Sequence, residues 1–350
     1  MTKIDIYSGF LGAGKTTLIK KMIKEAYAGQ KIVLIENEFG EIGIDGGFLQ
    51  EAGIQITEMN SGCICCSLVG DFGKALEQVI RDYAPDRILI EPSGVGKLSD
   101  VEAAVEKVVS DTVQLGDMVT VADAGKCKMY MKNFGEFYNN QVETAGTIVL
   151  SRTDSISAEK LSAAVALLKE KNPNAVIVTT PWDQLTGGQI LEAMEQGNTL
   201  LHEMQEHDHD EHEHCHHHDH DEHEHCHHHD HDEHEHCHHD HDHDACCGHD
   251  HHHHHHGHDA DEVFTSWGVE TPKVFSEADV HAALEALDSG KYGMILRAKG
   301  IVPGTDGQWI HFDFVPGEID LRHGAAAVTG RLCVIGSKLD EQGVAQLFGV

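Results

Sequence analysis

The sequence predicts a doubly wound α/β domain on a mainly parallel sheet, followed by a small α+β domain. Two observations favour this fold class: short apolar runs alternate with helical patterns through the first 200 residues, and a helix followed by several strand-like runs comes near the end. A chain of 350 residues also exceeds the usual length of one domain. We expect a first domain over 1–200, an insertion over 201–262 and a second domain over 263–350.

Seven apolar runs of the first domain have the length and composition of strands. Because helical patterns separate them, the sheet is expected to be parallel and covered on both faces. Helices are expected over about Gly14–Ala28, after Ser67 and over Ala158–Lys171. The predicted strands are Lys3–Ser8, Lys31–Glu36, Ile54–Met59, Arg87–Glu91, Met118–Asp123, Thr147–Ser151 and Ala175–Thr180.

The second domain begins where ordinary globular composition resumes, at Phe264. A helix is expected over Glu277–Leu287, and the strand-like runs after it indicate a mainly antiparallel sheet. These runs are Tyr292–Lys299, Trp309–Val315, Glu318–Leu321 and Ala327–Ile335.

The insertion between Leu201 and Val263 consists almost entirely of His, Asp, Glu and Cys. It holds 29 of the 32 histidines and 21 of the 59 acidic residues, which leaves 38 acidic against 25 basic residues elsewhere. The rest of the chain therefore carries about −13 of the net charge of −34, a balance that argues against binding nucleic acid. An eleven-residue unit at His209 recurs at His220 and nearly recurs at His231. With no apolar stripe to bury, this tract is expected to be disordered without metal.

The first residues run directly into a strand-like pattern and lack the layout of a signal peptide. No apolar run approaches the roughly 20 residues that span a bilayer, so we expect a cytoplasmic protein with no membrane partner. Thiols stay reduced in the cytoplasm. The ten cysteines are therefore interpreted as including metal ligands, with a disulfide framework as the alternative.

A glycine-rich loop with the spacing G-x-x-x-x-G-K-T lies between a predicted strand and a predicted helix. In this setting backbone N–H groups and a helix N-terminus bind phosphate, Lys15 neutralises the outer phosphates and the Thr16 hydroxyl ligates magnesium. Glu91 ends an apolar strand, where a carboxylate would hold the magnesium water shell or orient the attacking water. A helix-capping acid is the alternative for Glu91. The expected contacts of the loop with nucleotide are Gly9, Gly12, Ala13, Gly14, Lys15, Thr16 and Thr17.

Three cysteines, Cys63, Cys65 and Cys66, lie in the sequence between the glycine-rich loop and Glu91. Three thiolates within four residues can converge on one ion, and they favour zinc, copper(I) or cobalt over magnesium or calcium. An open fourth position suits transfer of the ion to another protein. Redox chemistry or a structural role in the core is the alternative. Cys127 and Cys333 are isolated in the sequence and are interpreted as packing residues.

The histidine-rich tract adds imidazole and thiol ligands at each repeat, which indicates a reservoir of many weak metal sites. Metal binding there should weaken below about pH 6.5, where imidazole takes up a proton. A solvated spacer with incidental affinity is the alternative. The representative ligands are His214, Cys215, His225, Cys226, His236 and Cys237.

Four motifs together resemble the CobW/HypB/UreG family of metal-handling GTPases, and its CobW-like branch in particular: Gly9–Thr17, Glu36–Gly40, Gly62–Cys66 and Glu91–Gly94. The resemblance covers the chain outside the histidine-rich tract. It implies a P-loop NTPase domain with a CobW-type C-terminal domain, and GTP hydrolysis coupled to delivery of a transition metal. It also implies a nucleotide-responsive switch over Glu36–Asp45, and dimerisation on nucleotide binding.

The same resemblance assigns roles to individual residues. Within the switch, Glu38 joins Lys15, Thr16 and Glu91 as an expected catalytic residue, and Gly94 is expected to sense the γ-phosphate. The family reads guanine with Asn-Lys-x-Asp, whereas this chain has Ser-Arg-Thr-Asp at 151–154. Asp154 can still accept hydrogen bonds from guanine and the Arg152 stem can still stack on it, but the serine loses an amide contact. GTP remains the expected nucleotide, and ATP is the alternative.

The leading hypothesis is a GTP-hydrolysing metallochaperone that holds zinc at the Cys-x-Cys-Cys site, with nickel and cobalt as the next choices. It would pass the ion to a metal-requiring client protein under the control of the bound nucleotide. The abundance of histidine supports a second hypothesis, a metal buffer or storage protein with little functional GTPase activity. A small-molecule kinase on the same loop is disfavoured, because no arginine-rich lid follows in the sequence.

Overall fold

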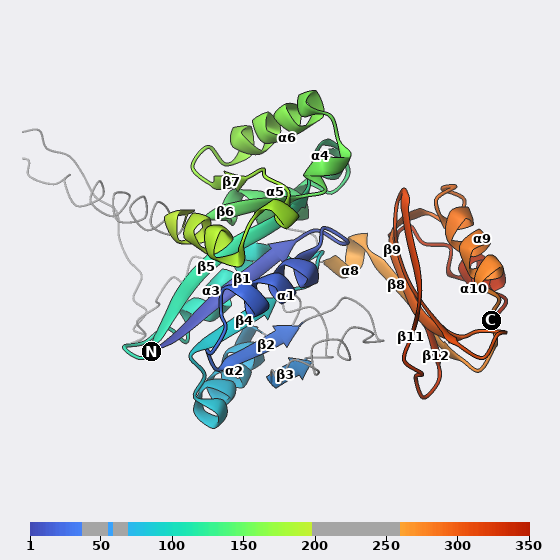
Figure 1. Cartoon of the computed structure of the whole chain (residues 1–350), viewed down its shortest axis with the longest axis horizontal. Helices are drawn as coiled ribbons and strands as arrows, with labels where there is room; N and C mark the ends of the chain where they lie inside the picture. Colours follow the sequence, from blue (N-terminus) through green and yellow to red (C-terminus); the bar gives the residue numbers. More distant parts are fainter. Residues whose placement is uncertain (37–54, 59–68, 198–259) are drawn as a thin grey trace, which may run out of the picture. The chain divides into compact units, whose positions relative to one another are not determined.

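The structure is a computed structural model that describes residues 1–36, 55–58, 69–197 and 260–350 (Figure 1). The predicted switch residue Glu38, the Cys-x-Cys-Cys run at 63–66 and the tract at 207–258 lie outside the described residues. Among the helices that are described, none has the length and apolar character required to cross a membrane.

Seven strands form the sheet of the first domain: β1 (Thr2–Gly9), β2 (Ile32–Glu36), β3 (Gln55–Glu58), β4 (Arg87–Glu91), β5 (Val113–Asp123), β6 (Thr147–Ser151) and β7 (Val176–Val178). All neighbouring strands are parallel, in the order β3-β2-β4-β1-β5-β6-β7. The predicted doubly wound parallel fold is confirmed. Because the strands are parallel, their carboxyl ends share one edge of the sheet, with β1 at its centre (Figure 1).

The helices of this domain are α1 (Lys15–Glu25), α2 (Val69–Tyr83), α3 (Leu98–Glu106), α4 (Cys127–Asn133), α5 (Gly135–Thr144) and α6 (Ala158–Lys171). They lie on both faces of the sheet, and consecutive residues of one strand enter different cores. Ile88 and Ile90 of β4 join a core with residues of α2 to α6, whereas Leu89 joins a core with α1 and the helical residues 187–197. Such two-sided burial explains why the strands are apolar throughout.

Serine caps fix the starts of two predicted helices. The Ser157 hydroxyl accepts the Lys160 N–H at 3.4 Å at the start of α6. The Ser276 hydroxyl accepts the Asp279 N–H at 3.0 Å at the start of α9 (Glu277–Leu287) in the second domain. Each cap satisfies an N–H group that has no partner within its own helix.

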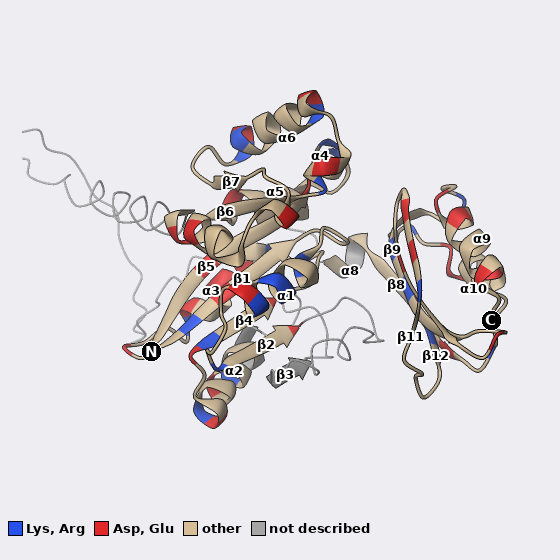
Figure 2. Ribbon diagram, viewed as in Figure 1, with Lys and Arg blue, Asp and Glu red and all other residues tan. Residues whose placement is uncertain are grey.

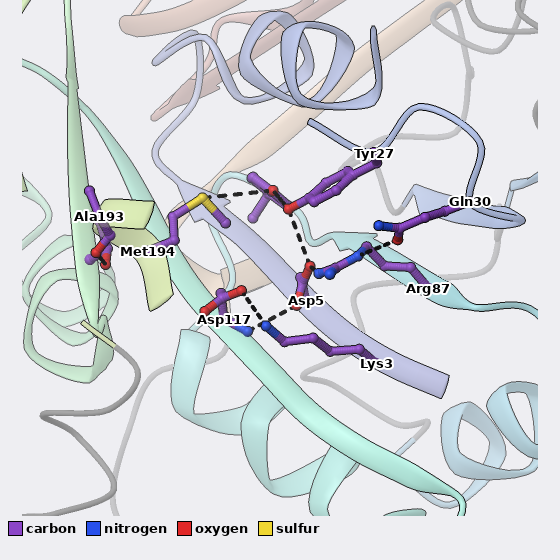
Figure 3. A network of polar contacts seen from close by, with 10 residues as sticks. Lys3, Asp5, Tyr27, Gln30, Arg87, Asp117, Ala193 and Met194 are labelled. Atoms are coloured by element: carbon purple, nitrogen blue, oxygen red, sulfur yellow. Dashed lines mark hydrogen bonds and ion pairs between the residues drawn. The ribbon is translucent and has the colours of Figure 1, made fainter. Parts of the chain in front are cut away.

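A buried polar network holds the first half of β1 between its neighbours (Figure 3). Most charged residues of this domain lie on its helices (Figure 2), but Asp5 and Asp117 lie fully buried in the sheet. The Asp5 carboxylate accepts hydrogen bonds from the Arg87 guanidinium and, at 3.3 Å, from the Tyr27 hydroxyl. The Lys3 ammonium donates to Asp117 at 2.9 Å, so two cations face two carboxylates. Burial and the Asp117 charge raise the pKa of Asp5.

The network lies at a β-bulge between β1 and β5. The register shifts there, so that Gly116 and Asp117 both lie opposite Asp5. The Asp117 N–H donates to Asp5 at 2.9 Å. A Cβ on Gly116 would lie 2.1 Å from the Asp5 carboxylate, so this position requires glycine.

The second domain is a five-stranded antiparallel sheet in the order β11-β10-β9-β12-β8. Its strands are β8 (Thr265–Thr271), β9 (Met294–Pro303), β10 (Trp309–Val315), β11 (Glu318–Gly324) and β12 (Gly330–Ser337). Apolar residues of the sheet, such as Phe312 and Leu332, form one core with residues of α9 and α10 (Glu341–Phe348). The predicted small α+β domain with an antiparallel sheet is therefore confirmed.

Replacing Arg87 by Leu should lower the free energy of unfolding by about 3–5 kcal/mol, because Asp5 would stay buried without its charged partner. Unfolding in denaturant, followed by circular dichroism, measures the change.

The matched control is Lys21→Met, which removes the cation of a solvent-exposed pair with Glu25 at 2.9 Å. Exposed pairs contribute little to stability, so this variant should lose far less than Arg87→Leu. Equal losses in the two variants would show that the buried network does not stabilise the domain.

Candidate functional site

The candidate site lies at the carboxyl ends of the parallel strands, where ligands bind in open α/β sheets. β1 ends at Gly9, β4 at Glu91, β5 at Asp123 and β6 at Ser151. The sheet order places these four strand ends side by side. Residues that are far apart in the sequence therefore meet around the end of β1.

The glycine-rich loop has the backbone of a phosphate cradle. Gly9 has a φ of 142°, and a Cβ there would lie 2.3 Å from the Val121 carbonyl oxygen, so only glycine fits. Gly14 caps α1 with a φ of 104°, and no side chain among the described residues caps this helix start. The first N–H groups of α1 therefore remain available to an anion. The Lys15 ammonium is buried and donates to the Gly9 carbonyl at 2.9 Å, so the lysine crosses the loop.

Thr16 and Glu91 join the loop to the neighbouring strand. The Thr16 hydroxyl lies 2.9 Å from one carboxylate oxygen of Glu91 and 3.1 Å from the other. Both groups are hard oxygen donors, the type that magnesium prefers. The residues predicted to hold magnesium are thus brought together, and their chemistry fits that ion.

A second part of the site is a cleft of about 430 Å³ beside the loop. Such a volume is within the range of small-ligand pockets. The cleft is lined by residues at and after the end of β6, by residues after β7 and by Gly14 of the phosphate loop. The residues from these two segments are Ser151, Arg152, Thr153, Asp154, Pro181, Trp182 and Asp183.

Arg152 links the cleft to the phosphate loop. Its guanidinium donates to the Gly12 carbonyl at 3.0 Å and to the Asp123 carboxylate at 3.2 Å. The backbone of Arg152 is in the left-handed region, with a φ of 55°, and the residue is the N-cap of the short helix η3 (Thr153–Ser155). The expectation that the Arg152 stem stacks on a base stays a prediction. What the structure adds is that its charged end supports the loop, with Asp123 as a partner that was not predicted.

Ser151 occupies the position at which the resembled family has Asn. Its hydroxyl is buried and has no hydrogen-bond partner among the described residues, and the same holds for the Thr153 hydroxyl. Asp154 lines the cleft and is exposed to solvent, as an acceptor for a base requires.

Trp182 is not among the residues predicted from the sequence. It lies in the short helix η4 (Trp182–Gln184), and its indole N–H donates to the Leu150 carbonyl at 2.8 Å. A Cβ on Gly14 would lie 3.2 Å from the indole ring, so the ring touches the phosphate loop. The signal that could have revealed it is its place just after a strand of the parallel sheet, since the ends of all such strands converge.

The predicted metal site at Cys63, Cys65 and Cys66 falls outside the described residues, as do Glu38 and the tract ligands. Within the described ranges, no group of three or more His, Cys, Asp or Glu residues could hold a metal ion. Cys127 is buried in a core, and burial raises the pKa of its thiol to about 11. Cys127 and Cys333 are both buried, which fits their interpretation as packing residues.

A parallel sheet whose first strand ends in such a loop, with a carboxylate on the next strand, defines the class of P-loop nucleotide-binding proteins. Residues 3–179 match the family described as CobW/HypB/UreG, nucleotide-binding domain. Residues 264–349 match the Cobalamin synthesis protein cobW C-terminal domain. The chain belongs to the CobW/HypB/UreG family, and the predicted P-loop nucleotide-binding class is confirmed with it.

Several curated relatives are similar to about half of this chain. The "Zinc chaperone CobW" of Sinorhizobium sp is 32% identical over 187 residues, which cover 45% of this chain and 52% of the relative. The "Zinc chaperone YjiA" of Escherichia coli K12 is 32% identical over 178 residues, covering 49% and 55%. The chain thus spans about half the length of the curated relatives it matches. A crystal structure of Zn(II)-bound YjiA GTPase from E. coli has 19% identity and a TM-score of 0.38, covering 99% of this chain and 98% of that one.

Trp182 and Asp154 line the same cleft, so we expect the indole ring to contact the base of a bound nucleotide. Replacing Trp182 by Ala should weaken GTP and GDP binding by about ten-fold, the effect of losing one aromatic contact with a base. Titration calorimetry with each nucleotide measures this change. Tripolyphosphate, which has no base, should bind the variant as tightly as the native chain, and Trp182→Phe should retain most of the affinity. An equal loss for tripolyphosphate and GTP would mean that Trp182 supports the phosphate loop alone.

Proposed function

We propose that this protein is a GTP-hydrolysing metallochaperone that binds zinc at Cys63, Cys65 and Cys66 and transfers it to a client protein under nucleotide control. The observation that carries the proposal is the junction of Thr16 with Glu91. This junction connects the phosphate loop to β4. In the sheet, β4 is followed by β2 and then by β3, and the cysteines come after β3 in the sequence.

The nucleotide half of the proposal rests on the chemistry of the described residues. Lys15 and the N–H groups at the start of α1 would hold the phosphates, and Asp154 would accept hydrogen bonds from guanine. Thr16 and Glu91 would hold magnesium, which neutralises phosphate charge when bound. Water would attack the γ-phosphorus, and the products would be GDP and inorganic phosphate. The role of Glu38 in this step is a proposal that rests on the family resemblance alone.

The metal half rests on the position of Glu58, the last described residue before the cysteines in the sequence. Glu58, Glu36 and Glu91 are register partners at the ends of β3, β2 and β4. With strands about 4.8 Å apart, the backbone at Glu58 lies about 10 Å from that at Glu91. Glu58 is the last described residue before the segment that carries the three cysteines, and it lies at the same edge of the sheet as the phosphate loop. The two strands between Glu58 and the end of β1 support coupling between nucleotide and metal.

Zinc is the proposed cargo, ahead of nickel and cobalt. Thiolates favour zinc, and relatives 30% and 32% identical are named zinc chaperones. A metal-requiring client protein is the proposed partner, and nucleotide-dependent dimerisation is a further proposal from the family resemblance. Free thiolates require a reducing compartment, so we propose the cytoplasm as the location.

Zinc should change the GTPase rate of the native chain by about five-fold or more, the lower range of coupling between two sites. Changing Cys63, Cys65 and Cys66 to Ala together should abolish this response, because the ion would lose its thiolate ligands. Phosphate release, measured across a zinc titration, tests both statements. The control Cys333→Ala removes a buried thiol of the second domain and should respond like the native chain. A full zinc response in the triple variant would remove the coupling claim.

The metal-buffer hypothesis keeps a specific observation in its favour, since 29 histidines exceed the ligands that one transferred ion needs. Deleting residues 207–258 should abolish metal tolerance if the tract buffers metal, whereas Lys15→Ala should then leave tolerance intact. Under the metallochaperone proposal, Lys15→Ala should instead abolish activation of the client. Growth in excess zinc and client activity in limiting zinc separate the two functions.

A further inference from the structure

The connection that follows β4, residues 92–96, borders the phosphate loop. All five residues are buried. A Cβ on Gly94 would lie 2.8 Å from the Leu11 nitrogen, so the two backbones are in contact there. The connection begins directly after Glu91, whose carboxylate accepts the Thr16 hydroxyl. It therefore adjoins the place of the outermost phosphate of a bound triphosphate.

Gln141 of α5 forms hydrogen bonds with the backbone of this connection. Its side-chain amide donates to the Gly94 carbonyl at 3.2 Å and to the Gly96 carbonyl at 2.8 Å. The residue is fully buried. Its own backbone carbonyl accepts the Thr120 hydroxyl at 2.6 Å, which ties it to β5. Gln141 thus joins a loop at the phosphate site to the rigid centre of the sheet.

Two other residues of α5 hold the start of α3, directly after this connection. Asn140 donates to the Ser99 hydroxyl at 2.9 Å and accepts the Ser99 N–H at 3.2 Å. Glu136 forms an ion pair with Lys97 at 2.9 Å. The segment from Gly94 to Ser99 is therefore supported along its length by one helix.

The side-chain oxygen of Gln141 is buried and has no hydrogen-bond partner among the described residues. An unpaired buried acceptor lowers stability, because it loses water without gaining a replacement. An apolar side chain of similar size would avoid this cost and still fill the space. The two carbonyl contacts are what the glutamine adds, so its role lies in the conformation of the loop.

We propose that Gln141 is a positioning residue that holds the Gly94–Gly96 backbone against the phosphate loop in the form that accepts a triphosphate. Gln141 does not touch the nucleotide in this proposal; it acts through the loop. Because the loop adjoins the outermost phosphate, Gln141 affects GTP and leaves GDP unaffected. The inference rests on the nucleotide half of the proposed function and is independent of zinc.

Gln141→Met tests the proposal, since it keeps the length of the side chain and removes both donors. The expected result is a loss of about ten-fold in affinity for a non-hydrolysable GTP analogue, with a similar loss in kcat and GDP affinity within about two-fold of native. Titration calorimetry and steady-state phosphate release provide these values, and thermal unfolding reports the stability of each variant.

Asn172, the residue that ends α6, offers a matched control at the C-terminal end of α5. It is a buried amide that donates to the carbonyls of Val142, Glu143 and Ala145 at 2.9, 3.1 and 2.9 Å. Asn172→Leu should lower the melting temperature as Gln141→Met does, yet leave the ratio of GTP-analogue to GDP affinity unchanged. The comparison separates general loss of stability from an effect on the loop.

Equal loss of GDP and GTP-analogue affinity in Gln141→Met, or no loss of either, would overturn the proposal. Should that variant fail to fold, Ser99→Ala loosens the start of α3, directly after the connection, at a less buried point. It should shift the affinity ratio in the same direction to a smaller extent. An unchanged ratio in Ser99→Ala would then count against the proposal. A native chain that binds no guanine nucleotide would instead overturn the proposed function, so the two failures are distinguishable.

Discussion

The contact between the Thr16 hydroxyl and the Glu91 carboxylate is the interaction on which the rest of this site depends. It joins the start of α1 to the end of β4, and these two elements are neighbours only because the sheet places β1 beside β4. Everything assigned to the nucleotide surrounds this junction. Lys15 lies one residue before it, the loop held by Gln141 follows it, and the cleft with Trp182 opens beside Gly14. A nucleoside triphosphate bound there would contact all three parts.

The parallel sheet connects this junction to the end of β3, the last described strand before the cysteines in the sequence. Glu91, Glu36 and Glu58 end three adjacent strands in register, and the chain leaves β2 and β3 into the two segments that contain Glu38 and the three cysteines. The end of β3 is therefore two strands away from the end of β4 in the sheet. In the proposed coupling between nucleotide and zinc, a change would pass from β4 through β2 to β3. The buried network at Asp5 keeps β1, the centre of this arrangement, in place at its other end.

The sequence predicts the fold well because most strands of the first sheet are short, apolar runs and most of them are separated by helical patterns. All seven strands of the first sheet are found, and Ala158–Lys171 and Glu277–Leu287 match their predicted bounds. Thr16 and Glu91 could both be assigned to magnesium from the sequence, since Thr16 opens a helix after one predicted strand and Glu91 ends another. The contacts of Trp182, Asp123 and Gln141 could not be predicted in the same way. Each depends on a side chain crossing between elements far apart in the sequence, and single buried polar contacts leave no periodic pattern.

Zinc affinity in two nucleotide states tests the central claim most directly. The chain with residues 207–258 deleted would be loaded with GDP in one sample and with a non-hydrolysable GTP analogue in another. Each sample would then be titrated with zinc in competition with a zinc-binding dye. The account predicts that zinc affinity differs by about ten-fold or more between the two states, and that Glu91→Gln removes most of the difference. The same zinc affinity in both states would contradict it.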